Sequence, residues 1–246
     1  MGQKYFNVYL EFDKEKVDSL IQTTIAKKGK GYVCSVESNN LTEANKNPEF
    51  LKVVNGALIN ICDGSVLAKI LSLLNKQNFC SYVGADLFIK YIRMCKYKQF
   101  FLGNTREVLD GLRKNLSNID PAISSMPFEE LPFKKVDEFD YMTIAAMINK
   151  EKPDIIWVSL GAPKQEFFMS YLLPHLEQGV MFGFGAIFNF NAGVSRVKRA
   201  PELMLNLKLE WLYRAFNEPH KNVPRYWRFI KILPKLIIQE LRKNKH

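Results

Sequence analysis

Apolar and polar positions alternate along the first 195 residues in two different rhythms. Short β-branched and aromatic runs predict strands at residues 5–9, 32–36, 57–62, 79–83, 100–102, 155–160 and 180–184. Between them, apolar residues at helical spacing predict helices at residues 66–74, 87–95, 108–116, 141–148 and 167–176. Strands that alternate with helices favour right-handed crossovers. We therefore predict an α/β domain over residues 1–195, with a mainly parallel sheet flanked by helices.

The pattern changes in residues 196–246. A helix is predicted over residues 201–216, and Pro219 and Pro224 are then expected to break it. Aromatic and aliphatic residues follow, interleaved with lysine and arginine at helical spacing. We predict a basic amphipathic helical appendage of the kind that lies on a membrane surface. The alternative is a helix that packs on the body of its own domain.

The charged residues are also distributed unevenly along the chain. Residues 196–246 contain thirteen Lys/Arg and four Asp/Glu, whereas the preceding 195 residues contain 22 and 21. A basic segment of this kind implies an anionic partner, which could be a membrane surface, a nucleic acid or a phosphate-bearing substrate.

The remaining composition is that of a globular protein, with 47% apolar residues. The four cysteines are widely spaced, which predicts buried, reduced thiols in a cytosolic protein. The three histidines are too scattered to indicate a metal site. The start of the chain lacks a signal pattern, and the weakly polar run 179–190 is too short to span a bilayer. We expect a soluble or peripheral protein.

Polar or glycine-rich turns follow several of the apolar runs. They are Asp63-Gly64-Ser65, Gly84-Ala85-Asp86, Gly103-Asn104-Thr105 and the segment from Gly161 onward. In a parallel sheet such turns share one edge, where ligands bind. We expect a polar crevice there that accepts phosphate groups.

The segment Trp157 to Glu166 reads as a strand followed by a Gly-Ala-Pro corner and the first turn of a helix. Lys164 and Gln165 would then point toward a bound ligand from a helix N-terminus. The alternative is a solvated corner with ordinary surface polar residues.

Asp63 follows a buried strand and is a candidate general base. It could equally cap the helix that follows, because aspartate is favoured at that position. Ser35 ends a neighbouring candidate strand and could reach the same edge, and Glu37 is the other nearby carboxylate.

An ordered set of motifs between about residue 30 and residue 226 resembles the WecG/TagA/CpsF bacterial glycosyltransferases. The motifs are Asp63-Gly64, Gly84-Ala85-Asp86-Leu87, Leu102-Gly103, Gly161-Ala162-Pro163-Lys164-Gln165-Glu166, Gly185-Ala186-Ile187-Phe188, Ala192-Gly193, Arg199-Ala200-Pro201, Glu210-Trp211-Leu212-Tyr213-Arg214 and Glu218-Pro219.

The resemblance implies a Rossmann-like fold and an inverting transfer of a sugar from a UDP-sugar to a lipid-diphosphate-linked sugar. It places the enzyme in the cytoplasm, on the inner face of the cell membrane, and N-acetylmannosamine transfer is the best-known reaction of the family. By motif, Asp63 matches the proposed base, Gln165 a polar active-site residue, and Ser35 a position that is often threonine. Arg214 matches an arginine thought to close over the donor diphosphate. A homo-oligomer is left open.

The chemistry of the residues fits those roles. The leaving diphosphate must be stabilised, and without an Asp-x-Asp metal motif that task falls to cations and backbone amides aimed at the developing charge. Arg214, Lys221 and Arg225 can supply the cations. For Arg214 the alternative is an ion pair with Glu210 or Glu218. We expect no metal and no cofactor beyond the UDP-sugar substrate. The predicted substrate-binding set is completed by a serine, two glycines, a lysine and two amides: Ser35, Gly84, Gly103, Lys164, Gln165 and Asn189.

Four departures from the family pattern weaken the identification of the donor sugar. Glu37 stands where asparagine is usual, Asn189 where many members have aspartate, and Lys221 where arginine is frequent. Met126-Pro127-Phe128 replaces a common Gly-Tyr-Phe turn. Glucose, mannosaminuronic acid or another sugar stays open as the donor.

Two rival functions fit the sequence less well. A dehydrogenase needs Gly-x-Gly-x-x-Gly, and the segment from Gly183 to Phe188 lacks the third glycine. A nucleic-acid binder would explain the basic, aromatic appendage but not the polar crevice.

Overall fold

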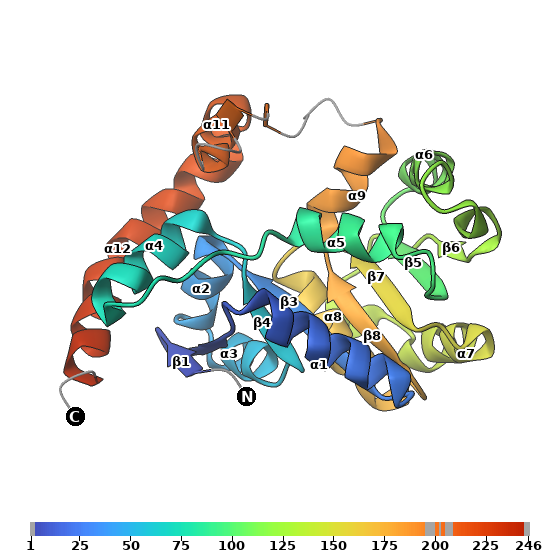
Figure 1. Cartoon of the computed structure of the whole chain (residues 1–246), viewed down its shortest axis with the longest axis horizontal. Helices are drawn as coiled ribbons and strands as arrows, with labels where there is room; N and C mark the ends of the chain where they lie inside the picture. The colour runs from blue at the N-terminus through green and yellow to red at the C-terminus, as the bar shows by residue number, and fades with distance from the viewer. Residues whose placement is uncertain (1–2, 195–199, 202, 205–208, 244–246) are drawn as a thin grey trace.

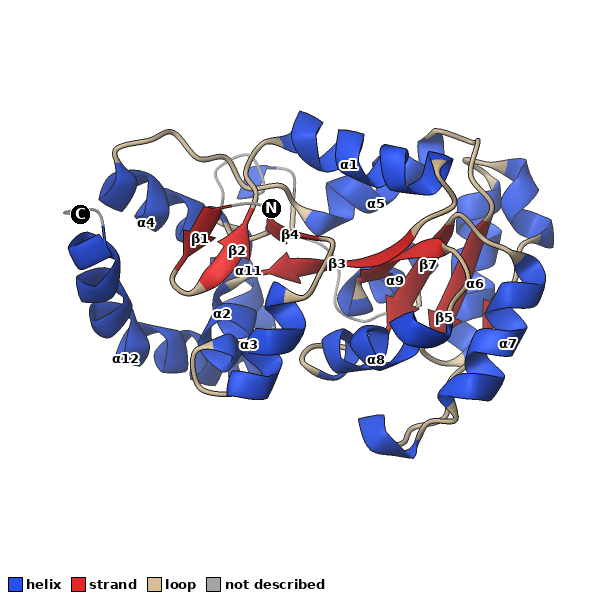
Figure 2. Ribbon diagram, turned by 90° about the horizontal axis from the view of Figure 1, so that it is seen from below, coloured by secondary structure: helices blue, strands red, loops and turns tan. Residues whose placement is uncertain are grey.

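The centre of the protein is a six-stranded sheet in which every strand is parallel to its neighbours (Figures 1 and 2). The structure, a computed structural model, describes residues 3–194, 200–201, 203–204 and 209–243. The strand order is β4-β3-β8-β7-β5-β6. Their bounds are β3 (Lys30–Val36), β4 (Ile59–Cys62), β5 (Gln99–Gly103), β6 (Phe128–Glu129), β7 (Ile155–Ser159) and β8 (Gly179–Gly183). The predicted α/β fold class is confirmed.

Successive strand residues are buried against two different helical layers. In β7, Ile156 and Val158 belong to one core cluster, whereas Ile155 and Trp157 belong to the other. The first cluster is covered by α2 (Ser38–Ala44), α3 (Pro48–Asn55), α4 (Ser65–Asn75), α7 (Tyr141–Glu151) and α8 (Lys164–Leu172). The second is covered by α1 (Lys14–Ala26), α5 (Gly84–Arg93), α6 (Arg106–Ser117) and α9 (Gly185–Ala192). Because both faces are covered, the strands read as continuous apolar runs. Three short 3₁₀ helices complete the connections: η1 (Pro121–Ser125), η2 (Val136–Glu138) and η3 (Leu173–His175).

The N-terminal run is a hairpin rather than the single strand predicted at residues 5–9. β1 (Gln3–Tyr5) pairs antiparallel with β2 (Val8–Leu10). Phe6 and Asn7 form the turn with φ values of 49° and 70°. Two consecutive residues with positive φ match the tight hairpin turn whose twist suits the flanking strands. The apolar character of Phe6 hid this turn from the sequence pattern.

The strand predicted at residues 79–83 is wrong, because this segment has no strand pairing and leads irregularly into α5. The aromatic residues of this segment pack against other side chains without forming a strand. Phe79 stacks on Phe12 with ring centroids 4.1 Å apart, and Tyr82 is buried. Conversely, the sequence does not predict the short edge strand β6, since the residues around it are rich in proline.

The prediction of four buried thiols holds for two cysteines only. Cys34 in β3 and Cys62 in β4 are buried, whereas Cys80 and Cys95 are exposed, and all four are free. Cys80 lies in the irregular segment before α5, and Cys95 follows that helix, so neither is part of the sheet.

The C-terminal segment forms α11 (Glu210–Asn217) and α12 (Pro219–Lys243). Pro219 begins α12, and Pro224 and Pro234 lie inside it, so the predicted break at Pro224 is wrong. We attribute the continuity to packing, because Phe229 and Leu236 are buried in the core on either side of Pro234. Within the predicted helix 201–216, residues 202 and 205–208 lie outside the described part of the chain.

α12 has two faces with different environments. The inner face packs against α2 and α4 (Figure 1), and Oε2 of the buried Glu240 accepts a hydrogen bond from the Phe6 backbone N–H at 3.0 Å. The outer face exposes Val223, Trp227, Ile238 and Leu241. One face of the appendage therefore packs on the body of its own domain, and the other face is exposed. None of the helices that the structure describes is long and apolar enough to cross a bilayer.

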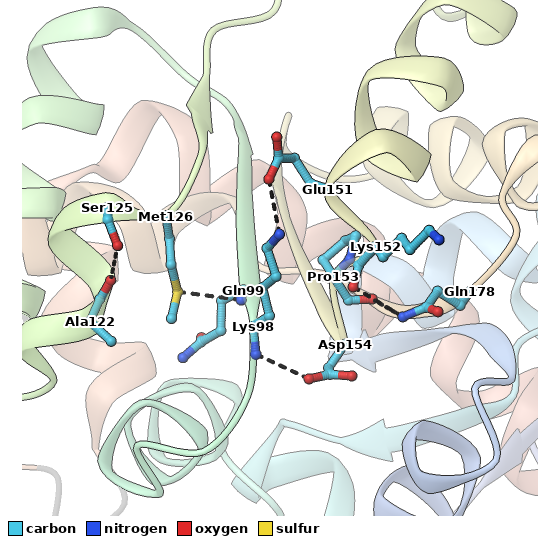
Figure 3. A network of polar contacts seen from close by, with 10 residues as sticks. All are labelled: Lys98, Gln99, Ala122, Ser125, Met126, Glu151, Lys152, Pro153, Asp154 and Gln178. Carbon is cyan, nitrogen blue, oxygen red and sulfur yellow. Dashed lines mark hydrogen bonds and ion pairs between the residues drawn. The ribbon is translucent and has the colours of Figure 1, made fainter.

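The amino ends of β5 and β7 are held by a polar network at the opposite edge of the sheet from the predicted crevice (Figure 3). The Lys98 backbone N–H donates to Asp154 at 3.0 Å, and the Lys98 ammonium lies 3.0 Å from Glu151. Gln178 donates to the carbonyls of Lys152 and Pro153. These bonds fix strand ends and leave the other edge of the sheet for ligands.

Candidate active site

A cavity of about 920 Å³ opens at the carboxyl edge of the sheet. Its walls come from the ends of β3, β4, β5, β7 and β8 and from α4, α11 and α12. The predicted convergence of the polar turns at one edge is therefore confirmed. The appendage supplies the wall that faces the sheet.

Asp63 follows β4 and lies partly recessed in the cavity wall. Its Oδ2 accepts a hydrogen bond from the Ser35 hydroxyl, and its Oδ1 accepts one from the Gly84 N–H at 3.0 Å. It does not cap its own helix, because Gly64 is the N-cap of α4 and no side chain caps that helix. Asp63 instead bonds the first residue of α5 across the cavity edge.

Burial raises the pKa of Asp63 above the ordinary aspartate value. The bonds from Ser35 and Gly84 and the positive charge of Arg214 act in the opposite direction and lower this pKa. Each carboxylate oxygen still has a free lone pair after these bonds. The arrangement is suited to a general base that is held in one orientation.

Gly84 and Gly103 are not among the cavity-lining residues. A Cβ at Gly84 would lie 3.0 Å from the Phe184 ring and 3.3 Å from Asp63 Oδ2. Gly103 has a φ of +93°, and a Cβ there would lie 2.8 Å from the Ser159 carbonyl oxygen. These glycines let neighbouring chain segments approach closely, while their neighbours Ala85 and Asn104 reach the cavity.

Gln165 lines the cavity but is only 5% exposed, which excludes the solvated corner for this residue. Its Oε1 accepts hydrogen bonds from the N–H groups of Gly161 and Gly185, each at 3.1 Å. Its Nε2 donates to the Gly183 carbonyl at 2.8 Å and to Glu166 at 3.1 Å. Both lone pairs and both protons of the amide are thus used within the protein. Gln165 ties the turn after β7 to the turn after β8.

Several backbone N–H groups of the turns are already hydrogen-bonded within the protein. The N–H groups of Gly161, Gly185 and Gly84 already donate to Gln165 and Asp63, and the Thr105 N–H donates to Asn104. They are therefore not free to cradle a phosphate in this arrangement. Among the described residues, the cationic side chains that line the cavity are those of Lys164, Arg214, Lys221 and Arg225.

Arg214, Lys221 and Arg225 line the wall formed by α11 and α12. Arg214 donates to Glu210 Oε1 from Nε at 3.0 Å and from Nη2 at 2.6 Å, so the ion pair weighed as an alternative exists. Lys221 lies 3.4 Å from Glu218. Arg225 forms no ion pair with any other residue in the described ranges. Both arginines keep their charge at physiological pH.

Lys164 and Asn189 line other parts of the cavity. The Lys164 ammonium lies 5.0 Å from the ring centroid of Phe139 and 5.2 Å from that of Phe133. Asn189 accepts from Asn104 at 3.4 Å, and Asn104 also donates to Ser159 at 3.0 Å. Asn104 and Ser159 were not predicted as site residues, although Asn104 lies in one of the polar turns that the sequence indicated.

Glu166 is a buried polar residue beside the cavity that the sequence did not indicate as part of the site. It is fully buried, and its Oε1 accepts from Asn40 and Gln165, each at 3.1 Å. Burial raises its pKa to about 7, and the charge of Glu37 contributes in the same direction. Glu166 supports Gln165 from behind the cavity wall.

Among the residues that the structure describes, no three or more His, Cys, Asp or Glu side chains are grouped so that they could hold a metal ion.

Comparison with known proteins finds relatives that are similar over most of this chain and share one name. A relative from Bacillus spizizenii is 27% identical over 92% of this chain and 85% of its own length. One from Bacillus subtilis is 25% identical over 94% and 86%, and one from Staphylococcus aureus is 30% identical over 76% of both chains. All three are named N-acetylglucosaminyldiphosphoundecaprenol N-acetyl-β-D-mannosaminyltransferase.

The family profile described as "Glycosyl transferase WecG/TagA/CpsF family" matches residues 6–246. This match covers both the sheet that carries Asp63 and the helices that carry the three cations, and it supports neither the dehydrogenase nor the nucleic-acid binder. The chain belongs to the WecG/TagA/CpsF family of glycosyltransferases.

Proposed function

We propose that the protein transfers N-acetylmannosamine, or a closely related hexose, from a UDP-sugar to N-acetylglucosaminyl-diphospho-undecaprenol. The observation that carries this proposal is that one cavity is lined both by Asp63, at the edge of the sheet, and by Arg214, Lys221 and Arg225, on α11 and α12. The names of the relatives support the identity of donor and acceptor. Glu37 and Asn189, which depart from the usual family residues, are the positions where donor preference would differ.

The proposed reaction is a direct displacement with inversion at the anomeric carbon. Asp63 takes the proton of the acceptor hydroxyl while that oxygen forms a bond to the anomeric carbon. The bond from the anomeric carbon to the diphosphate oxygen breaks on the opposite face, and UDP leaves with the electron pair. Arg214, Lys221 and Arg225 stabilise the charge that develops on the diphosphate. No divalent ion is needed in this scheme, because side-chain cations supply the positive charge.

The proposal is tested by incubating the protein with a panel of UDP-sugars and a lipid-diphosphate acceptor, in the presence of a chelator, and weighing the products. We expect one added N-acetylhexosamine or hexose unit and turnover that persists in the chelator. Strict dependence on added manganese would contradict the metal-free scheme, and the absence of product with every donor would refute the proposed transfer.

Asp63→Asn is expected to lower turnover by about 10²–10⁴-fold, because the amide cannot accept the proton. The amide oxygen can still accept the Gly84 N–H, so thermal stability and UDP-sugar binding should change little. Turnover equal to that of the wild type would exclude Asp63 as the base.

The same proposal includes the place of action. The acceptor is a membrane lipid, and the exposed outer face of α12 combines Trp227 and Ile238 with Lys231 and Lys235. We propose that this face binds the anionic cytoplasmic surface of the bacterial membrane peripherally.

A further inference from the structure

The side of α12 that faces the cavity changes from cationic to apolar along its length. Lys221, Arg225, Phe229 and Leu233 all line the cavity, and they recur every four residues on one face of the helix. A rise of 1.5 Å per residue puts Leu233 about 18 Å from Lys221 along the helix axis. One wall of the cavity therefore has a positive end and an apolar end.

A second apolar wall comes from α4. Val66, Leu67 and Ile70 line the same cavity. Because α4 begins two residues after Asp63, these side chains lead away from the candidate base. Figure 1 shows α4 beside α12, and the two helices are in contact. We define the space lined by Val66, Leu67 and Ile70 of α4 and by Phe229, Ile230 and Leu233 of α12 as the α4–α12 channel.

Part of the α4–α12 channel is apolar surface that the protein leaves open. Val66 is 42% exposed and Ile230 is 53% exposed, although both line the cavity. Exposed apolar side chains on their own are common, but these are continuous with a cavity whose other end is cationic. That gradient is complementary to an amphiphile with an anionic diphosphate and a hydrocarbon tail. A nucleotide lacks the long hydrocarbon chain that would fill the apolar end.

We propose that the α4–α12 channel binds the first isoprenoid units of the acceptor lipid, and that the acceptor diphosphate lies at the cationic end of the cavity, where it shares the positive charge of Lys221 and Arg225 with the donor diphosphate. This inference rests on the proposed function and adds the path of the lipid tail. The tail would run from the cationic end, along Phe229 and Leu233 on one side and Ile70 on the other, toward the outside of the protein. The acceptor would thus be recognised by its hydrocarbon as well as by its sugar.

The test compares two acceptors with the same N-acetylglucosaminyl-diphosphate head, one with a long hydrocarbon chain and one with a very short chain. Both are used below their micelle concentrations and without vesicles, so that membrane binding cannot contribute. The measured quantity is the ratio of kcat/KM for the long-chain acceptor to kcat/KM for the short-chain acceptor. We expect a wild-type ratio well above one.

Ile70→Ser and Leu233→Ser are each expected to lower this ratio by about tenfold or more, because each exposes the tail to a polar side chain in place of several buried methylene contacts. Leu73→Ser is the matched control: Leu73 is also on α4, is 74% exposed and does not line the cavity, so the ratio should stay at the wild-type value. Where a serine variant does not fold, judged by its thermal unfolding, the alanine variant at the same position replaces it.

A wild-type ratio near one, or unchanged ratios in both channel variants, would overturn the inference while the proposed function stands. No product from either acceptor with the wild-type protein would instead show that the proposed function has failed. The two failures are therefore distinguishable in one experiment.

Discussion

At the scale of single residues, Glu166 is a buried carboxyl group that lies directly behind the cavity wall. It lies behind Gln165, contacts Asn40, and is fully enclosed. Its neighbours include Cys34 and Glu37, whose electrostatic interactions with Glu166 are unfavourable when the groups are ionised. A carboxylate in this position is costly, so the protonated acid is favoured up to a pH near its pKa of about 7.

Glu166→Gln is expected to flatten the pH dependence of stability. In the folded protein the pKa of Glu166 is about 7, against an ordinary value of 4.5. The unfolded chain therefore loses this proton at lower pH than the folded chain does, and the free energy of unfolding falls as pH rises from 4.5 through 7. The loss approaches about 3 kcal/mol for a shift of this size. Urea unfolding at pH 4.5 and pH 8 measures it.

The matched control for this prediction is Glu49→Gln, because Glu49 is an exposed glutamate on α3. That variant should keep the wild-type pH dependence. A wild-type protein and a Glu166→Gln variant with parallel stability curves would show that the buried carboxyl does not titrate in this range.

The sequence predicted the position of some site residues better than their roles. Asp63 could be placed because the carboxyl ends of parallel strands meet at one edge. Gln165 could be placed for the same reason, but its partners Gly183 and Gly185 lie 18 and 20 residues further along the chain. The burial of Glu166 depends on Asn40, which is 126 residues away. Contacts at such separations leave no local pattern.

At the scale of secondary-structure elements, α12 combines three environments in one helix. Its inner face is buried, its cavity side is cationic and then apolar, and its outer face is exposed with aromatic, aliphatic and basic residues. The helical spacing and the basic, amphipathic character were predictable from sequence. Its continuity through Pro224 and Pro234 was not, because it depends on packing against α2 and α4.

Lys231→Gln combined with Lys235→Gln is expected to weaken binding to anionic vesicles by about 30-fold, since each basic side chain near such a surface contributes about 1 kcal/mol. Sedimentation with vesicles of increasing anionic-lipid content measures the effect. Lys27→Gln combined with Lys28→Gln, at the end of α1, is the charge-matched control and should bind as the wild type does. Equal binding by both double variants would exclude the outer face of α12 as the contact surface, and tighter salt-dependent binding to duplex DNA than to vesicles would favour a nucleic-acid partner instead.

At the scale of the whole molecule, the two ends of the described chain are joined. The Glu240 carboxylate near the end of α12 accepts the N–H of Phe6 in the turn between β1 and β2, at a sequence separation of 234 residues. Its other oxygen lies 3.6 Å from the Lys243 ammonium. The alternation of strands and helices predicted the fold class. It could not predict the strand order or this contact, which only the folded arrangement brings together.

Glu240→Ala is expected to lower the free energy of unfolding by about 1–3 kcal/mol, because it leaves a buried backbone N–H without its charged acceptor. The decrease is measured by urea unfolding at neutral pH. Gln239→Ala changes an exposed neighbour on the same helix and should alter stability by less than about 0.5 kcal/mol. A Glu240→Ala variant as stable as this control would show that the contact contributes nothing to stability.

The junction between α12 and the first hairpin also has a consequence for biosynthesis. Translation proceeds from the N-terminus, and the early parts of a chain can fold before the late parts exist. Here α12, which is made after the other described elements, supplies core residues, one wall of the cavity and the acceptor for an amide in the turn between β1 and β2. We therefore expect the nascent enzyme to complete its cavity only after α12 has been made, so that a chain stalled before α12 would hold no working enzyme.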